Sequence, residues 1–313
     1  RQYVPAIETL SVAGWEPVPH ARTDDARVVV ERYGSFTSDD LHFTLRSETD
    51  EKPVRVTLNL AGLGIPPGDA GRLKARDLLT GNPVPVAGTP PAVTVTVPAN
   101  GAAAFAVGTP EGWARDGLRR AGAGLARIER LFEAELTPAH REQIAAGRRE
   151  AEEAAKGADL LAGAAQVLAA LDRLAPAIAT QAPADLAKQL YRLRSEVAAG
   201  TAALVGVDTE LIRCVRAPQG SAAEAVVSLR GTGRAVRVTE TRILSPWPEV
   251  AAACKASGPA GELNPGADGQ VRLSLTVPAQ PQRSLLPFLV TLAGTAAGKP
   301  FEIARMVDVE VAP

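Results

Sequence analysis

The residues whose side chains could do chemistry in this chain are three histidines, two cysteines and a few paired acids. His20, His42 and His140 lie far apart, and none has a cysteine or a second histidine at the spacing of a metal ligand. We therefore predict structural or surface roles for the histidines, and we expect no metal site and no cofactor.

Two acidic pairs, Asp24-Asp25 and Asp39-Asp40, lie in predicted turns. Carboxylates in turns commonly accept hydrogen bonds from backbone N–H groups. Hydrolysis of a glycoside would instead need two carboxylates about 5–10 Å apart across a cleft. The turn role is the preferred interpretation, and clustering of these acids in one cleft would favour an enzyme.

Two common functional motifs are absent from the sequence. No G-x-S-x-G nucleophile elbow and no phosphate-binding G-x-x-x-x-G-K-[ST] loop occurs.

The chain has 34 Lys and Arg residues and 35 Asp and Glu residues, so its net charge is −1. This balance argues against a surface that binds nucleic acid or an anionic membrane through bulk charge. No run of about 18 apolar residues occurs, so we predict no membrane span.

The aromatic residues offer three candidates for contact with carbohydrate, Trp247, Trp113 and Tyr33. An exposed ring face stacks on the apolar C–H face of a sugar, and Trp247 lies in a rigid Ser-Pro-Trp-Pro loop. Core packing is the alternative role for each of them. Cys214 and Cys254 fall in one predicted domain, where a disulfide in an exported protein and two buried thiols are both open interpretations.

The elements that must position these residues change character along the chain. Residues 21–109 alternate apolar and polar side chains with period 2, as in Val54-Arg55-Val56-Thr57-Leu58, and turn-forming clusters separate the runs. This pattern predicts an antiparallel β-sandwich. Residues 206–313 show similar runs and predict a C-terminal immunoglobulin-like β-sandwich.

Residues 110–205 between the sandwiches are rich in Ala, Arg and Glu and have apolar residues at spacings of three and four. They predict an antiparallel three-helix bundle. Its second helix is expected from Thr137-Pro138, a cap followed by proline, to about Leu174, with a break over 172–183. The predicted fold class is thus multidomain, with β and α parts.

The first residues predict a short helix. Val4, Ile7 and Leu10 follow a helical spacing, no capping residue precedes them, and Gly14 is placed as a C-terminal glycine. We interpret residues 1–20 as the last helix and exit of a preceding barrel, in the C-terminal part of a longer protein. A complete domain is the alternative.

Residues 3–18, YVPAIETLSVAGWEPV, carry a resemblance, and weaker similarity continues through Val29–Gly34, Leu41–Leu45 and Asp77–Gly81 to about residue 107. This part resembles the C-terminal region of bacterial (β/α)-barrel glycoside hydrolase-like proteins. The resemblance implies a catalytic barrel upstream and a small β-domain here. No matched position is a catalytic motif, so no catalytic residue is carried over.

Two functions follow as hypotheses. In the first, the chain is a non-catalytic accessory region that scaffolds or spaces the upstream barrel of a glycoside hydrolase-like protein. In the second, it is a stand-alone carbohydrate-binding or cell-surface interaction module. Both hypotheses suit an extracellular or periplasmic location, with the cytoplasm as the alternative.

Overall fold

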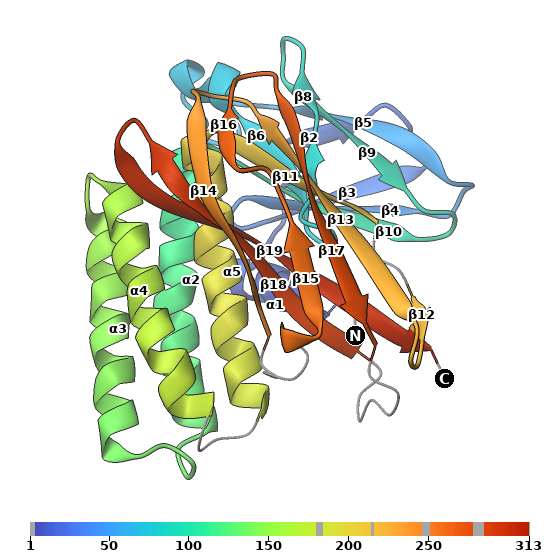
Figure 1. Ribbon diagram of the computed structural model, residues 1–313. Helices are drawn as coiled ribbons and strands as arrows, with labels where there is room; N and C mark the ends of the chain where they lie inside the picture. The colour runs from blue at the N-terminus through green and yellow to red at the C-terminus, as the bar shows by residue number, and fades with distance from the viewer. Residues whose placement is uncertain (1–3, 180–183, 214–215, 246–250, 278–284, 313) are drawn as a thin grey trace. The chain divides into compact units, whose positions relative to one another are not determined.

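The structure is a computed structural model that describes residues 4–179, 184–213, 216–245, 251–277 and 285–312 (Figure 1). The chain divides into two compact units, Arg1–Trp113 and Ala114–Pro313. Mixed β and α structure with antiparallel sheets confirms the predicted fold class. No described helix combines the length and the apolar content needed to cross a bilayer.

The first unit contains two antiparallel sheets with one hydrophobic core. A six-stranded sheet has the order β1-β3-β4-β10-β6-β7, and a four-stranded sheet has the order β2-β5-β9-β8. The strands are β1 (Trp15–Glu16), β2 (Ala21–Thr23), β3 (Val28–Tyr33), β4 (His42–Ser47), β5 (Lys52–Leu58), β6 (Lys74–Asp77), β7 (Pro83–Val84), β8 (Val86–Ala87), β9 (Ala92–Val97) and β10 (Ala102–Gly108), with a 3-10 helix over Pro67–Arg72.

The period-2 pattern explains which face of each strand is buried. Val54 and Val56 of β5 lie opposite Val95 and Val93 of β9, and all four are buried. Alternate side chains of a strand point to opposite faces, so the polar residues between them face outward. The strands predicted from this alternation are confirmed.

A short helix, α1 (Val4–Ala13), precedes the first strand. It ends as predicted at Gly14, which has a φ of 85° and whose N–H donates to the carbonyl of Leu10 at 3.0 Å. Glycine adopts this left-handed conformation without the steric cost that a Cβ would bring. Within α1 only Ala6 is buried.

The helical region contains four helices: α2 (Pro110–Leu131), α3 (Pro138–Lys156), α4 (Leu160–Ala179) and α5 (Ala184–Val205). The N-terminal cap of α3 is the predicted one, since the Thr137 hydroxyl accepts a hydrogen bond from the His140 N–H at 3.2 Å. Figure 1 shows the four helices side by side.

The prediction of three helices is wrong, because the expected long second helix is two helices. The N–H of Gly157 donates to the carbonyls of Glu153 and Ala154 at 3.1 Å, which ends α3. Asp159 then accepts the N–H of Ala162 at 3.2 Å and begins α4. In Gly157-Ala158-Asp159, a glycine that can end one helix is followed by an aspartate that can cap the next, and this pattern indicates the turn. The chain also stays helical beyond Asp172, to Ala179.

The rest of the second unit has a four-stranded sheet, β11-β13-β17-β15, and a five-stranded sheet, β12-β19-β18-β14-β16, around one core. All neighbouring strands are antiparallel except β12 and β19. The strands are β11 (Val207–Arg213), β12 (Ala217–Pro218), β13 (Ala222–Gly231), β14 (Val236–Leu244), β15 (Cys254–Ser257), β16 (Gly261–Leu263), β17 (Asp268–Thr276), β18 (Leu285–Ala296) and β19 (Lys299–Ala312).

Strand β19 takes part in two cores. Val307 and Val309 pack into the core between the sheets, whereas Ala304 and Met306 pack against the helical core. Leu289 of β18 also belongs to the helical core. These alternating positions place the helices on the outer face of the five-stranded sheet, so the helices and the second sandwich form one compact unit.

A buried cluster of charges joins the helices to this sheet. The guanidinium of Arg194 on α5 donates to both carboxylate oxygens of Glu302 on β19, at distances of 2.6–3.0 Å. Asp172 on α4 also pairs with Arg194, and Arg242 on β14 lies 3.4 Å from Glu302. The side chain of Arg194 is only 3 % exposed, so its charge depends on these partners.

Candidate functional site

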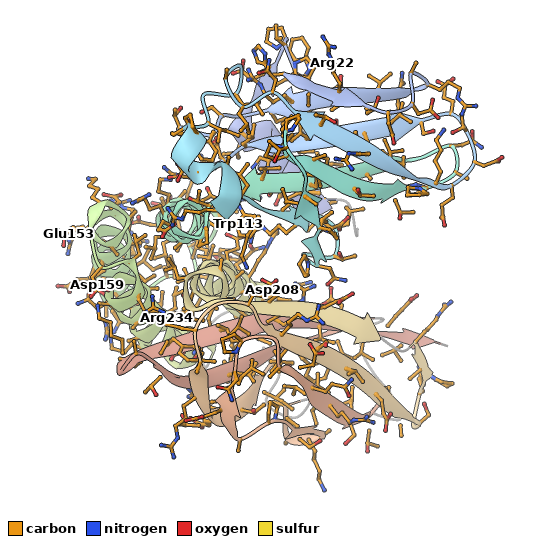
Figure 2. All side chains as sticks on the ribbon, turned by 90° about the horizontal axis from the view of Figure 1, so that it is seen from above. Arg22, Trp113, Glu153, Asp159, Asp208 and Arg234 are labelled. Carbon is orange, nitrogen blue, oxygen red and sulfur yellow. The ribbon has the colours of Figure 1, made fainter. Side chains whose placement is uncertain are left out.

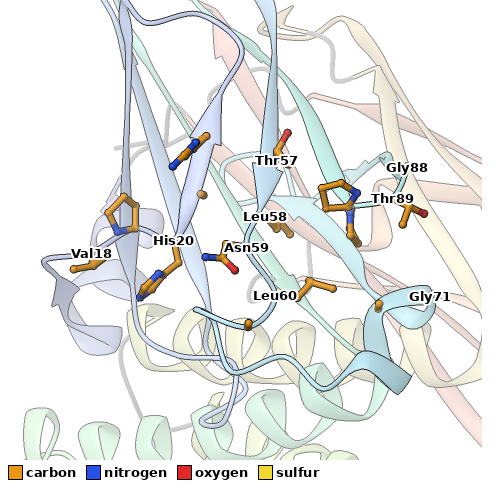
Figure 3. Close-up of a pocket in the computed structure, with 16 residues that line it drawn as sticks. Val18, His20, Thr57, Leu58, Asn59, Leu60, Gly71, Gly88 and Thr89 are labelled. Atoms are coloured by element: carbon orange, nitrogen blue, oxygen red, sulfur yellow. The ribbon is translucent and has the colours of Figure 1, made fainter.

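A surface groove of about 1010 Å³ lies in the first unit (Figure 3). Four segments line it: residues 18–22, 57–61, 70–71 and 88–91. They come from strand β2 and its approach, the end of β5 and the turn after it, the 3-10 helix, and the loop between β8 and β9. The volume is at the upper end of the range for small-molecule pockets, about 300–1,000 Å³.

His20 is held in this groove by an uncommon backbone conformation. Its φ is 48°, in the left-handed region that residues with a Cβ seldom adopt. The carbonyl of His20 accepts the N–H of Asn59 at 2.9 Å, which fixes the turn. Non-glycine residues in such conformations cluster at functional sites, where surrounding contacts maintain them.

Gly62 provides the space for the His20 ring. A Cβ at position 62 would lie 2.3 Å from Nδ1 of His20 and 3.0 Å from Nδ2 of Asn59. The Gly62 N–H donates to Oδ1 of Asn59 at 3.2 Å. An imidazole and an amide therefore lie together beside one glycine, and Figure 3 shows both at the groove.

The one fully charged side chain in the groove lining is that of Arg22, which is positive. Arg22 on β2 lies opposite Thr57 of β5, is exposed, and lies on the outer surface of the first unit (Figure 2). The lining contains no Asp or Glu. In the part of the chain that the structure describes, neither the Arg22 guanidinium nor the His20 imidazole hydrogen-bonds to another protein group.

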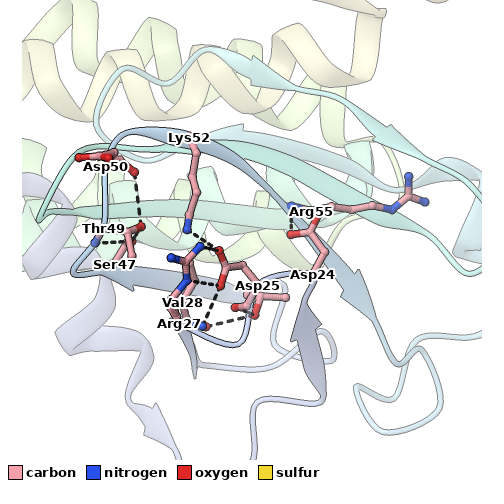
Figure 4. A network of polar contacts seen from close by, with 10 residues as sticks. Asp24, Asp25, Arg27, Val28, Ser47, Thr49, Asp50, Lys52 and Arg55 are labelled. Carbon is pink, nitrogen blue, oxygen red and sulfur yellow. Dashed lines mark hydrogen bonds and ion pairs between the residues drawn. The ribbon is translucent and has the colours of Figure 1, made fainter.

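The first acidic pair has structural partners (Figure 4). Asp25 accepts hydrogen bonds from Arg27 at 3.1 and 2.8 Å and pairs with Lys52. The hydrogen bonds from Arg27, followed by the one from Lys52, hold the pKa of Asp25 well below its usual range. Asp24 accepts the backbone N–H of Arg55 at 3.0 Å.

The second acidic pair also shapes a turn. Oδ1 of Asp40 accepts the N–H of Ser35 at 3.0 Å, and Asp39 adopts a φ of 59°. None of the four acids lines the groove. The preferred interpretation of these acids as turn residues is confirmed by their hydrogen bonds at Asp24 and Asp40.

The aromatic candidates have different surroundings. Trp113 is 8 % exposed, with the Arg76 guanidinium 4.9 Å above its ring, so the ring packs against protein rather than offering a face. Tyr33 is partly buried, and burial raises the pKa of its hydroxyl. Trp247 lies outside the described residues. Trp15 is exposed and lies opposite Tyr33 in the β1–β3 pair.

The remaining histidines and cysteines form no site within the part of the chain that the structure describes. His42 and His140 are buried. Among the described residues, no three His, Cys, Asp or Glu side chains gather in a way that could hold a metal ion. Cys254 is a half-buried free thiol whose pKa burial raises to about 11, and Cys214 lies outside the described residues.

No protein family and no curated protein matches the sequence. Solved structures give weak, partial matches. The VesB protease of Vibrio cholerae is 10 % identical, with a TM-score of 0.27 over 34 % of this chain and 32 % of that chain. A family 123 glycoside hydrolase from Clostridium perfringens is 7 % identical, with a TM-score of 0.23 over 31 % of this chain and 22 % of that chain.

The periplasmic chaperone SfaE is 16 % identical, with a TM-score of 0.24 over 34 % of this chain and 57 % of that chain. The chain spans about a third of the length of the VesB protease. TM-scores this low carry no argument about fold or function.

Proposed function

We propose that this chain is a non-catalytic accessory region of a glycoside hydrolase-like protein. Its role is to pack against a folded catalytic barrel through its N-terminal segment and to order or space that barrel. The proposal includes an extracellular or periplasmic location, where such enzymes meet polymeric carbohydrate.

The observation that carries the proposal is an apolar surface on residues 4–18, here called the N-terminal apolar segment. Five of the seven exposed large hydrophobic residues of the described structure lie in it: Val4, Ile7, Val12, Trp15 and Val18. Val12 is 87 % exposed and Trp15 is 60 % exposed. Scattered exposed apolar residues are ordinary, but a concentration of them marks an interaction surface.

A folded protein domain suits this surface better than a small ligand. The groove nearby is lined in part by Val18, but Ile7, Val12 and Trp15 lie outside its lining. Exposed aliphatic side chains and a tryptophan are typical of the buried centre of a protein interface. The segment is also the part of the chain that resembles the end of a hydrolase barrel, which supports a barrel as the partner.

The two acidic pairs of the first unit support a non-catalytic role. Glycoside hydrolysis needs one carboxyl group free to donate a proton and a second one free to act as nucleophile or base. Asp25 is instead held by Arg27 and Lys52, and Asp24 and Asp40 accept backbone hydrogen bonds.

The test begins with the gene upstream of the codon for Arg1. A barrel domain there is produced as a separate polypeptide, and its binding to this chain is measured with wild type and with Ile7→Ser/Val12→Ser/Trp15→Ser. We expect the triple variant to fold normally and to lose binding by at least tenfold. The matched control is Leu131→Ser, which changes an exposed apolar residue of the second unit that is 55 % exposed.

Two results contradict the proposal. One is a gene that encodes no folded domain beside this segment. The other is equal binding of the wild type, the triple variant and the Leu131→Ser control.

A second candidate function is a carbohydrate-binding module that needs no attached enzyme. The groove at His20 favours it, because an imidazole, an amide and a guanidinium converge on a cavity of suitable size. A screen of the isolated chain against oligosaccharides tests this candidate. Saturable binding would support it, and no binding at millimolar sugar would contradict it.

A further inference from the structure

The charge of the groove lining favours an anionic ligand over a neutral one. Its one fully charged side chain is Arg22, and its lining has no carboxylate that could neutralise this charge. A neutral saccharide would gain little from an arginine in this position. An anion would gain charge-assisted hydrogen bonds from the planar guanidinium, which can donate two parallel N–H groups to one carboxylate or sulfate.

We propose that the groove binds an anionic saccharide, with its carboxylate or sulfate on Arg22 and its ring hydroxyls on Asn59, Thr57 and His20. This inference rests on the second candidate function and names its ligand class. It is independent of the docking role of the N-terminal apolar segment.

The polar groups that would meet the ring are of the required types. The Asn59 amide both donates and accepts, as does a threonine hydroxyl, and a sugar hydroxyl needs both kinds of partner. Asn59 is exposed, and Thr57 lies directly across from Arg22 in the β2–β5 register. Arg22 and Thr57 are thus neighbours in one strand pair, and Asn59 and His20 lie just beyond the ends of its two strands.

The apolar part of the lining comes from prolines. Pro19 lies on one side of His20 in the sequence, and Pro90 and Pro91 come from the loop between β8 and β9. Proline rings are rigid and apolar, so they can contact the C–H face of a sugar without losing side-chain freedom. No Trp, Tyr or Phe occurs in this lining.

The groove is preorganised around His20. Its backbone is fixed by the bond from Asn59, and its ring occupies the space that Gly62 leaves open. A site whose groups are already in place loses less conformational freedom when a ligand binds. This makes Gly62 a positioning residue, because a methyl group there must displace the imidazole.

The experiment is a calorimetric titration of the full chain at low salt with three oligosaccharides of equal length. The probes are tetragalacturonate, a sulfated tetrasaccharide and neutral cellotetraose. We expect an acidic probe to bind at least tenfold more tightly than cellotetraose, and we expect its binding to weaken as salt is added. Comparison of the two acidic probes identifies carboxylate or sulfate as the anion.

Variants locate the site. Arg22→Gln should weaken binding of the acidic probe about tenfold or more, and Arg22→Lys should weaken it less, because the charge remains while the planar fork is lost. The matched control is Arg46→Gln, which removes an exposed arginine of the six-stranded sheet in the same unit. Gly62→Ala should also weaken binding, with folding checked by circular dichroism.

Different failures have different meanings. Equal binding of cellotetraose and the acidic probes overturns this inference and leaves the second candidate function intact. No saccharide binding at millimolar concentration overturns both. Equal losses in Arg22→Gln and Arg46→Gln also overturn the assignment, because they would show a general charge effect. Competition by sodium acetate or sulfate alone, as strong as that of the oligosaccharide, excludes recognition of the sugar ring.

Discussion

Removal of the carboxylate from Glu302 should destabilise the second unit strongly. Glu302 is 11 % exposed and receives three hydrogen bonds from Arg194, whose side chain is 3 % exposed. In Glu302→Gln the guanidinium keeps Asp172, which is 47 % exposed, as its remaining anionic partner. A charge that water cannot reach is then only partly compensated.

The expected loss of unfolding free energy is about 3 kcal/mol, the lower end of the range of about 3–5 kcal/mol for breaking a buried pair. The lower end applies because Asp172 remains and an amide can still accept one hydrogen bond. For a domain of about 150–250 residues, 1 kcal/mol lowers Tm by about 2–4 °C, so the transition of the second unit should shift by about 6–12 °C.

Thermal and urea unfolding of the full chain measure this loss. The matched control is Arg230→Gln, which breaks the pair Arg230–Asp268 in the same unit, where the two side chains are 64 % and 63 % exposed. Solvent screens such a pair, so the control should lose less than about 1 kcal/mol. The paired variant Arg194→Met/Glu302→Leu should recover much of the stability. If Glu302→Gln loses no more than the control, the interpretation of the cluster as buried and coupled is refuted.

Three further predictions concern packing, pH and thiol chemistry. Gly163→Ala should lower the Tm, because the new Cβ would lie only 2.8 Å from the Cβ of Ala154. The control Gly122→Ala in α2 should raise the Tm, because alanine favours the helix and its new Cβ would have its nearest neighbour at an ordinary 3.6 Å. Equal Tm shifts in the two variants would contradict the close contact at Gly163. The lowered pKa of Asp25 means that its stabilising effect is present above the unfolded carboxyl pKa of about 3.9 and is lost as the pH falls through the lower folded value. Asp25→Asn should therefore lower the Tm at pH 6, and the difference from wild type should diminish toward pH 2; a constant difference would disprove the ion-pair explanation. In a Cys214→Ser variant, Cys254 should react slowly with a thiol reagent at pH 8, because burial raises its pKa to about 11. Unfolding in urea should make the reaction rapid. Fast reaction in the folded protein would contradict the burial of this thiol.

Local patterns in the sequence predict much of the fold. Period-2 runs such as Val54–Leu58 indicate strands, because alternate residues of a strand face one core. The capped start at Thr137-Pro138 and the glycine end at Gly14 are also set by neighbouring residues. The extra helix escapes the prediction because Leu161 and Leu168 continue the apolar spacing of α3 across the turn at Gly157.

The groove could not be predicted in the same way. It depends on a left-handed conformation at His20 and on Gly62, which lies more than forty residues later and leaves space for the ring. Neither residue belongs to a motif, and histidine is not a residue type that favours a positive φ strongly enough to be recognised from sequence. The pairing of Arg22 with Thr57 likewise follows from strand register, which the sequence pattern does not specify between distant strands.

The two-sided use of β19 has a consequence for how the second unit unfolds. Its odd-numbered residues Val307 and Val309 stabilise the core between the sheets, while Ala304 and Met306 stabilise the helical core. Unfolding of this strand would therefore disrupt both cores at once. We therefore expect helices and sheets to melt in a single cooperative transition, with equal calorimetric and van't Hoff enthalpies. The helical region would then not fold or unfold independently of the second sandwich. Its deletion would expose Leu289 and neighbouring apolar residues on one face of the sheet, and this exposed face would promote aggregation.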